Sequence, residues 1–97
     1  MQVKIPHKFT KAQALAQVKT ALDKMRPQLA GKATIDEERW EGDVLHFAVD
    51  GQGQHISGTL TVEDTCFELY AKLPLMMKMF EGRIEKMIAD QAAQMLK

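Results

Sequence analysis

The spacing of hydrophobic residues changes twice along this chain, and the two changes limit the folds that it can adopt. Before Gly31 the apolar positions recur every three or four residues, as in an amphipathic helix: Leu15, Val18, Leu22 and Met25. From Ala33 to Leu73 apolar and polar residues alternate in short segments, which is typical of strands. From Leu75 onward the helical spacing returns. The pattern predicts a helix, a group of strands and a second helix.

A short strand precedes the first helix. Gln2 to His7 alternates weakly, and Pro6 suits an edge strand because proline cannot donate to a neighbouring strand. Thr10 and Gln13 have the spacing of a capping box, in which each side chain satisfies the other residue's backbone N–H. Pro27 disfavours a helical residue before it, so the helix is expected to end or kink near Pro27. The alternative is that Leu29 extends the apolar stripe by one more turn and that Gly31 marks the exit.

Turn residues divide the middle of the chain into four strands. The turns contain Glu41-Gly42-Asp43, Asp50-Gly51-Gln52-Gly53 and Glu63-Asp64-Thr65, about ten residues apart as in an antiparallel meander. A turn at Asp64-Thr65 places three apolar pairs on one face: Val62 with Phe67, Leu60 with Leu69, and Gly58 with Ala71. The segment Ala33 to Trp40 carries three consecutive acids from Asp36 to Glu38 and is expected at an edge.

These elements predict a two-layer α+β fold in one domain, residues 1–97, with the order β-α-β4-α. The curved antiparallel sheet has five strands, and both helices pack on one face, with a long final helix (Leu75 to Leu96) across it. Gly82 inside that helix indicates close packing or a bend. The other sheet face is expected to meet water or a partner through His46, Ala48, His55, Ser57, Thr59, Thr61, Glu68, Tyr70 and Lys72.

Charge and cysteine content exclude several classes of function. The chain has 13 basic and 13 acidic residues, so no overall field attracts nucleic acid. The N-terminal third is basic and the middle acidic, which fits solvated faces of mixed sign better than internal pairing. Cys66 is the single cysteine, which favours a reducing compartment. With no signal peptide and no apolar run long enough to span a membrane, we expect a cytoplasmic protein.

Residues with the potential for chemistry are few. His46 and His55 share the outer sheet face, directly opposite or one diagonal step apart, but a metal site needs a further ligand. Cys66 has no basic neighbour in sequence to activate it, and Trp40 is expected to cover one end of the core. No nucleophile or phosphate-binding motif is present. We therefore predict a non-enzymatic protein without a metal or cofactor.

The stretch Leu73 to Gly82, LPLMMKMFEG, is the strongest candidate for an interaction surface. On one continuous helix Met76 and Phe80 face the sheet, whereas Met77 lies on the flank of that stripe and Met79 about 100° away. Flexible methionines fill gaps in cores and also line adaptable binding surfaces. The periodicity therefore leaves three residues for a partner: Leu75, Met77 and Met79.

Several segments resemble the polyhydroxyalkanoic acid system proteins, small bacterial proteins encoded near polyester-granule genes. The similarity extends from Val3 to Leu96, and it is carried by Pro6-His7, by Trp40-Glu41-Gly42-Asp43 with Leu45-His46-Phe47, and by Phe80-Glu81-Gly82-Arg83-Ile84-Glu85. The resemblance implies a regulator or surface-associated protein of storage-polyester granules, and it supplies no catalytic residue. It also implies the β-α-β4-α order of folds like that of the TATA-binding protein. The chain departs from the family pattern at Pro27-Gln28, where the helix is expected to run on.

Two functional hypotheses follow. In the first, the protein binds the granule surface or a granule protein through the apolar positions of residues 75 to 79. In the second, it holds a small apolar ligand between the sheet and the final helix, where methionines and Gly58 leave room. Homodimerisation through the exposed sheet face or an edge strand is compatible with both.

Overall fold

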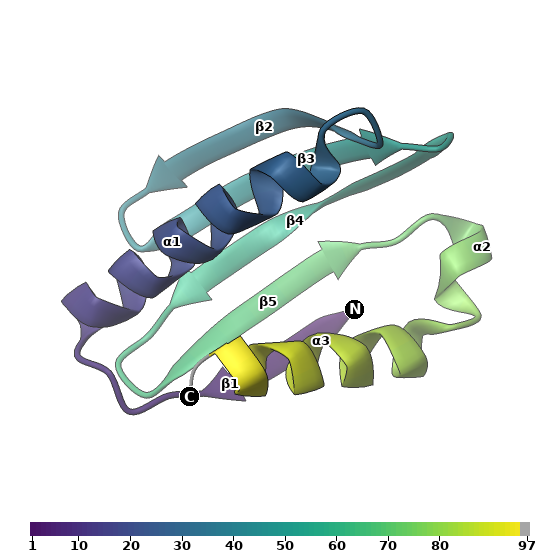
Figure 1. Cartoon of the computed structure of the whole chain (residues 1–97). Coiled ribbons are helices and arrows are strands. Elements are labelled where there is room, and N and C mark those ends of the chain that lie inside the picture. Colours follow the sequence, from purple (N-terminus) through teal and green to yellow (C-terminus); the bar gives the residue numbers. More distant parts are fainter. Residues whose placement is uncertain (96–97) are drawn as a thin grey trace.

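A five-stranded antiparallel sheet carries α1 and α3 on one face, which confirms the α+β class (Figure 1). The computed structural model describes residues 1–95. The strands lie in the order β1-β5-β4-β3-β2, so the predicted edge strands β1 and β2 are at the two edges. The elements are β1 (Gln2–Pro6), α1 (Lys11–Leu29), β2 (Thr34–Glu41), β3 (Val44–Gly51), β4 (Gln54–Val62), β5 (Cys66–Lys72), α2 (Leu75–Lys78) and α3 (Glu81–Met95).

The predicted register between β4 and β5 is confirmed at each position. Val62 lies opposite Phe67, Leu60 opposite Leu69, and Gly58 opposite Ala71. At Gly58 the two backbones approach so closely that a Cβ atom would collide with the carbonyl oxygen of Tyr70 and lie 2.8 Å from the Cα of Ala71. Gly58 therefore allows a close approach of two strands. It leaves no room for a ligand, contrary to the expectation.

The core lies between α1 and the adjoining part of the sheet. Its buried members come from α1, β3, β4 and β5: Ala14, Val18, Leu45, Val62 and Phe67. Trp40 packs against this cluster while partly exposed, which confirms that it covers one end of the core. The ammonium group of Lys19 lies 5.6 Å from the centroid of the Trp40 ring, within the range of a cation–π interaction.

The start of α1 is as predicted, and its end is the later of the two that the sequence left open. Thr10 and Gln13 form the capping box, with hydrogen bonds of 3.1 and 3.2 Å. Pro27 neither ends nor visibly interrupts the helix, which runs on to Leu29. A proline so close to the end removes a single backbone hydrogen bond, and the Ala30 N–H still donates to the Arg26 carbonyl at 3.1 Å. The chain then leaves through Gly31, at φ +77°.

The predicted long final helix is two helices. After the single turn of α2 the chain bends at Met79 and Phe80, and α3 begins at Glu81. Helix α3 lies over β1, at one edge of the sheet rather than across its middle (Figure 1). A Cβ atom on Gly82 would have nothing within 4 Å, so close packing does not explain this glycine. Leu96, the expected end of the helix, lies outside the described residues.

The oppositely charged segments of the chain face each other in part. Lys11 in α1 pairs with Asp43 at 2.8 Å, and Arg26 pairs with Glu38 of β2 at 2.6 Å. The acids raise the pKa of the Lys11 ammonium, first through its hydrogen bond with Asp43. Ion pairs thus join the basic helix α1 to the acidic β2–β3 hairpin. More of these charges pair within the fold than the sequence analysis expected.

Candidate functional site

The segment between β5 and α3 places apolar side chains at one end of the molecule. Leu73 is buried and ends the apolar row of β5. Pro74 then caps α2 in an extended conformation, with φ −58° and ψ 153°. Its carbonyl accepts hydrogen bonds from the N–H groups of Met77 and Lys78, at 2.9 and 3.2 Å. The segment is therefore one tight helical turn that projects from the end of a strand.

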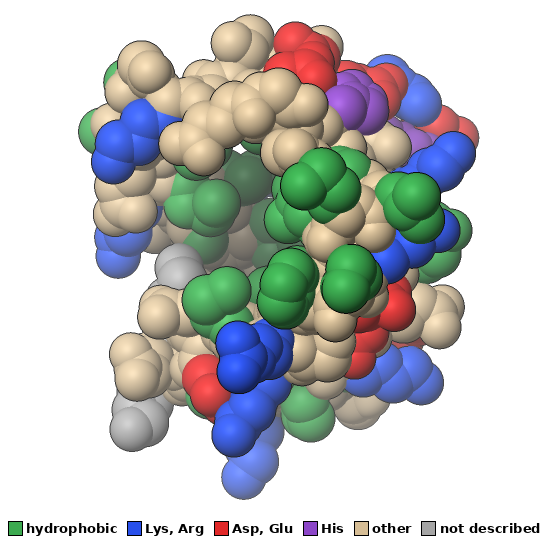
Figure 2. All heavy atoms as spheres, turned by 90° about the vertical axis from the view of Figure 1, so that its right-hand side faces the viewer, with side chains coloured by type: hydrophobic (Ala, Val, Ile, Leu, Met, Phe, Trp, Pro, Cys, Tyr) green, Lys and Arg blue, Asp and Glu red, His purple; other side chains and the backbone are tan. Residues whose placement is uncertain are grey.

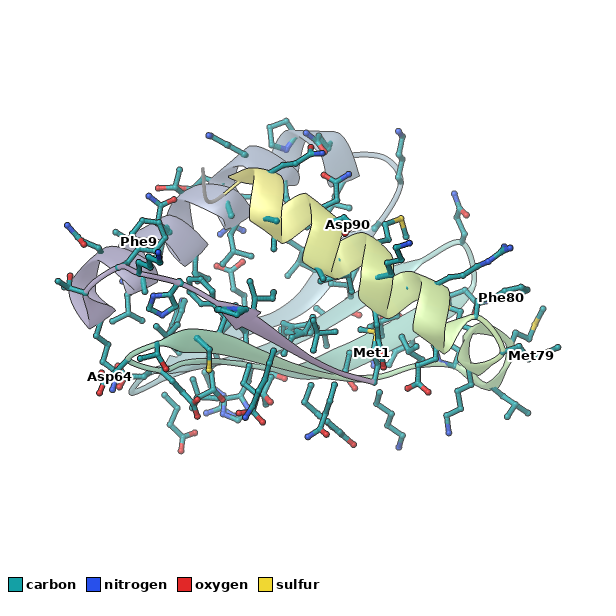
Figure 3. The ribbon with its side chains drawn as sticks, turned by 90° about the horizontal axis from the view of Figure 1, so that it is seen from below. Met1, Phe9, Asp64, Met79, Phe80 and Asp90 are labelled. Atoms are coloured by element: carbon teal, nitrogen blue, oxygen red, sulfur yellow. The ribbon has the colours of Figure 1, made fainter. Side chains whose placement is uncertain are left out.

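Four side chains of this segment are exposed to solvent. The exposed fractions are 81% for Leu75, 72% for Met76, 84% for Met79 and 54% for Phe80. We call these four residues the apolar tip. Figure 2 shows hydrophobic side chains gathered on this end of the molecule, and Figure 3 shows Met79 and Phe80 at its extremity. Large apolar groups that cluster in the open are typical of interaction surfaces.

The membership of this surface differs from the prediction. Leu75 and Met79 are exposed as expected, but Met76 and Phe80 are also exposed and do not face the sheet. Met77, expected to remain outside, is half-buried. The prediction assumed one continuous helix, and the bend at Met79 and Phe80 changes the direction of the side chains. The bend falls just before Gly82, where the sequence indicated close packing or a bend, so the glycine marks the region of the break but not its position.

The base of the tip is held by polar contacts with the first residue. The amino group of Met1 donates to the carbonyl oxygen of Ala71 at 2.9 Å and forms an ion pair with Glu81 at 2.8 Å. The Ala71 N–H donates in return to the Met1 carbonyl at 2.9 Å. Glu81 opens α3, where a carboxylate also favours the helix N-terminus. These contacts fix the beginning of α3 against β5.

A hollow beside the tip is lined by hydrophobic side chains (Figure 2). It lies between α1 and α3, above the face of the sheet that these helices cover (Figures 1 and 2). Several apolar residues on this face are only half-buried: Phe47, Ile56, Leu60 and Leu69. The two helices thus leave part of the apolar face incompletely covered.

The two histidines considered for a metal are not adjacent. His46 lies opposite Thr59, whereas His55 lies opposite Asp50 near the hairpin tip, so the expected pairing is wrong. A β-bulge between Ile35 and Glu37 instead brings Asp36 to the same corner as His55 and Asp50. Ligand atoms of these three exposed residues lie within 4.8 Å of one another. Because His55 Nδ1 already contacts Asp50 at 2.8 Å, a hydrogen bond accounts for their proximity and we assign no metal.

The surroundings of Cys66 disfavour its thiolate form. Its Sγ donates to a carboxylate oxygen of Glu63 at 3.1 Å. This hydrogen bond raises the pKa of the Cys66 thiol, and burial and the negative charge of Glu63 act in the same direction. The thiolate is the nucleophile, so this environment opposes reactivity.

The buried imidazole of His7 was not singled out from the sequence as a structural residue. The residue is 9% exposed, and its ring forms hydrogen bonds with backbone groups of Glu63 and Phe9. The available signal was its place in the short Pro6-His7 motif before the first helix. Both ring nitrogens are occupied by structural contacts, so the arrangement positions the chain rather than offering a base for chemistry.

Fold and surface together define a small α+β protein with an open sheet face and an apolar tip. The chain belongs to a family of polyhydroxyalkanoate-system proteins, since the family model described as "Putative polyhydroxyalkanoic acid system protein" matches residues 1–96. No curated protein and no solved structure matches the chain. The likeness to folds of the TATA-binding-protein type therefore stays a prediction. Among the described helices, none is both long and apolar enough to cross a membrane.

Proposed function

We propose that this protein acts without catalysis in the polyhydroxyalkanoate system of a bacterial cytoplasm, as a granule-associated or regulatory protein. In this proposal the apolar tip binds the polyester granule or a protein on it. The observation that carries the proposal is the exposure of Leu75, Met76 and Met79, each above 70%. Family membership supplies the polyester context. Met77, the other residue that the sequence left for a partner, is half-buried.

Binding through the tip would bury hydrophobic area. Exposed apolar side chains gain roughly 25 cal/mol for each Å² removed from water, and a polyester surface or an apolar protein groove provides that burial. Leu75, Met76 and Met79 lie close together in sequence and all three are exposed, so one contact can cover them. Methionine side chains adapt to an irregular surface because they are unbranched and flexible.

The test compares a substitution in the tip with the same substitution elsewhere. Met79→Glu places a charge in the tip, and Met25→Glu places one on α1, where Met25 is 45% exposed. Purified protein is mixed with polyhydroxyalkanoate particles and sedimented. We expect the wild type and Met25→Glu to sediment with the particles and Met79→Glu to stay in solution. Retention of Met79→Glu on the particles, with its circular dichroism spectrum unchanged, would contradict the proposal.

The hollow between α1 and α3 favours a second candidate function, the binding of a small apolar ligand. Phe47 and Ile56 are half-buried and belong to the apolar rows of β3 and β4, the sheet face above which the hollow lies. Native mass spectrometry of the protein purified from its own host tests this directly. A bound apolar molecule, lost in a Phe47→Ala variant, is the expected result. The mass of the bare chain alone would refute it.

A further inference from the structure

The charged residues next to the apolar tip are basic and exposed. Lys78 lies in α2 between Met77 and Met79, and Arg83 follows Met79 by four residues in the first turn of α3. Lys72 ends β5, just before the tip, and Lys86 follows one turn after Arg83. All four side chains are exposed. Figure 2 shows Lys and Arg side chains directly beside the hydrophobic cluster.

Some cations elsewhere in the molecule are paired with carboxylates, whereas others, such as Lys8 and Lys24, have no ion-pair partner among the described residues. Lys11, Arg26 and Arg39 form ion pairs with carboxylates of the β2–β3 hairpin. Within the described part of the chain, Lys72, Lys78, Arg83 and Lys86 have no ion-pair partner within 4.0 Å. Of the two acids nearby, Glu81 is paired with the amino group of Met1, and Glu85 is half-buried. The positive charge around the tip is therefore available to an external partner.

The shape of the tip limits what that partner can be. Exposed fractions above 70% on Leu75, Met76 and Met79 mean that these side chains project into solvent and form no groove. A projecting apolar group is buried either by a matching pocket or by a fluid interface that closes around it. Cations around it add attraction when that interface is negatively charged. Peripheral proteins enter an anionic lipid layer through this kind of arrangement, an apolar projection with unpaired cations beside it.

We infer that the apolar tip and the cations beside it bind the protein to an anionic lipid surface. Leu75, Met76 and Met79 would enter the acyl boundary, while Lys78 and Arg83 contact acidic headgroups. This deepens the proposed function and rests on it, because it names a negatively charged lipid layer as the surface that the tip recognises. The unpaired cations add an attraction to acidic headgroups that an uncharged polymer face alone does not offer.

The experiment is co-sedimentation of the full chain with vesicles of two compositions. One set is phosphatidylcholine alone, and the other contains roughly one third phosphatidylglycerol, an acidic lipid. At low salt we expect the acidic vesicles to bind at least about tenfold more tightly. We expect high salt to remove this difference. Equal binding to both sets, or binding to neither, would overturn the inference.

Two variants assign the charge effect to the tip. Lys78→Gln/Arg83→Gln removes two cations beside it, and Lys8→Gln/Lys24→Gln removes two exposed cations elsewhere. The first is expected to reduce binding to acidic vesicles about tenfold, and the second to change it little. Equal losses in both variants would mean that only net charge matters, and the inference would fall. Met79→Glu is expected to abolish binding to acidic vesicles. If this variant still binds them, the tip is not part of the contact and the inference is wrong.

Sedimentation with lipid-free polyester particles separates the two proposals. Loss of particle binding in Met79→Glu, together with no vesicle binding by the wild type, would leave the granule proposal standing and refute the lipid inference. Charge-dependent vesicle binding without any binding to granules would support the lipid inference and refute the granule proposal. Binding to granules only when their surface proteins are present would identify a protein partner and overturn the lipid inference.

Discussion

His7 donates a hydrogen bond from Nε2 to the backbone carbonyl of Glu63 at 2.8 Å, across 56 residues of chain. The Nδ1 atom accepts from the Phe9 N–H at 3.1 Å, which requires the proton of the neutral ring to be on Nε2. The ring also packs against Phe67, with centroids 4.6 Å apart. One side chain thus joins the segment before α1 to the turn between β4 and β5.

Replacing His7 with alanine is expected to destabilise the protein strongly. The variant loses the contact with Phe67, opens a cavity and leaves the Glu63 carbonyl without its donor, which together cost about 2–4 kcal/mol. Urea unfolding followed by circular dichroism measures the free energy of unfolding. His55→Ala is the control, because His55 is exposed and contacts only Asp50 among the hydrogen-bond partners described. Similar losses in the two variants would contradict a structural role specific to His7.

Two glycine-to-alanine substitutions are expected to have opposite effects. At Gly58 the added methyl group meets the backbone of β5, so Gly58→Ala is expected to lower the free energy of unfolding by at least about 2 kcal/mol. At Gly82 the methyl group has open space, and alanine is the better helix former, so Gly82→Ala is expected to gain about 0.5 kcal/mol. Thermal unfolding of both variants checks the pair. A stable Gly58→Ala protein would mean that β4 and β5 separate readily.

The thiol of Cys66 is expected to react slowly until its environment changes. The Glu63 carboxylate raises the pKa of this thiol, so a smaller fraction is thiolate at any given pH. Glu63→Gln removes the negative charge and is expected to lower that pKa, which shifts the pH–rate profile of alkylation to lower pH. The backbone carbonyl that accepts from His7 remains in this variant. An unchanged profile would show that burial, the next contributor, dominates instead.

The strand arrangement could be predicted from the sequence because it depends on local patterns. Each strand alternates with period two, and a shift of one residue would turn every apolar side chain to the wrong face. Val62 and Phe67 therefore fix one register, and the turn at Asp64 and Thr65 fixes the same one. The capping box of Thr10 and Gln13 is likewise complete within four residues.

The surface of residues 75 to 80 could be predicted only in part, because its directions depend on a bend. Met76 and Phe80 have the spacing of one helical face, but the chain does not keep one axis through Met79. The corner formed by Asp36 and His55 was missed for a similar reason, since a bulge of one residue re-aims a side chain without a sequence signature. In both places a tertiary feature decides where a polar or apolar group points.

Pro27 provides a further prediction, because it lies inside α1 against its own preference. Pro27→Ala restores an N–H group that can donate to the carbonyl four residues earlier, at Asp23, and removes the clash of the ring with that turn. We expect the free energy of unfolding to rise by about 1 kcal/mol, less than for a proline in mid-helix, because the last turn bends easily. Urea unfolding measures the change.

Gln28→Ala is the matched control, because Gln28 is the next residue, is also exposed and has nearly the helix propensity of alanine. It is expected to change stability by only a few tenths of a kcal/mol. A loss of stability in Pro27→Ala but not in Gln28→Ala would contradict the prediction. It would mean that the proline ring stabilises the fold, by lowering the conformational entropy of the unfolded chain, more than it destabilises the helix. The exit of α1 toward Gly31 would then depend on this effect.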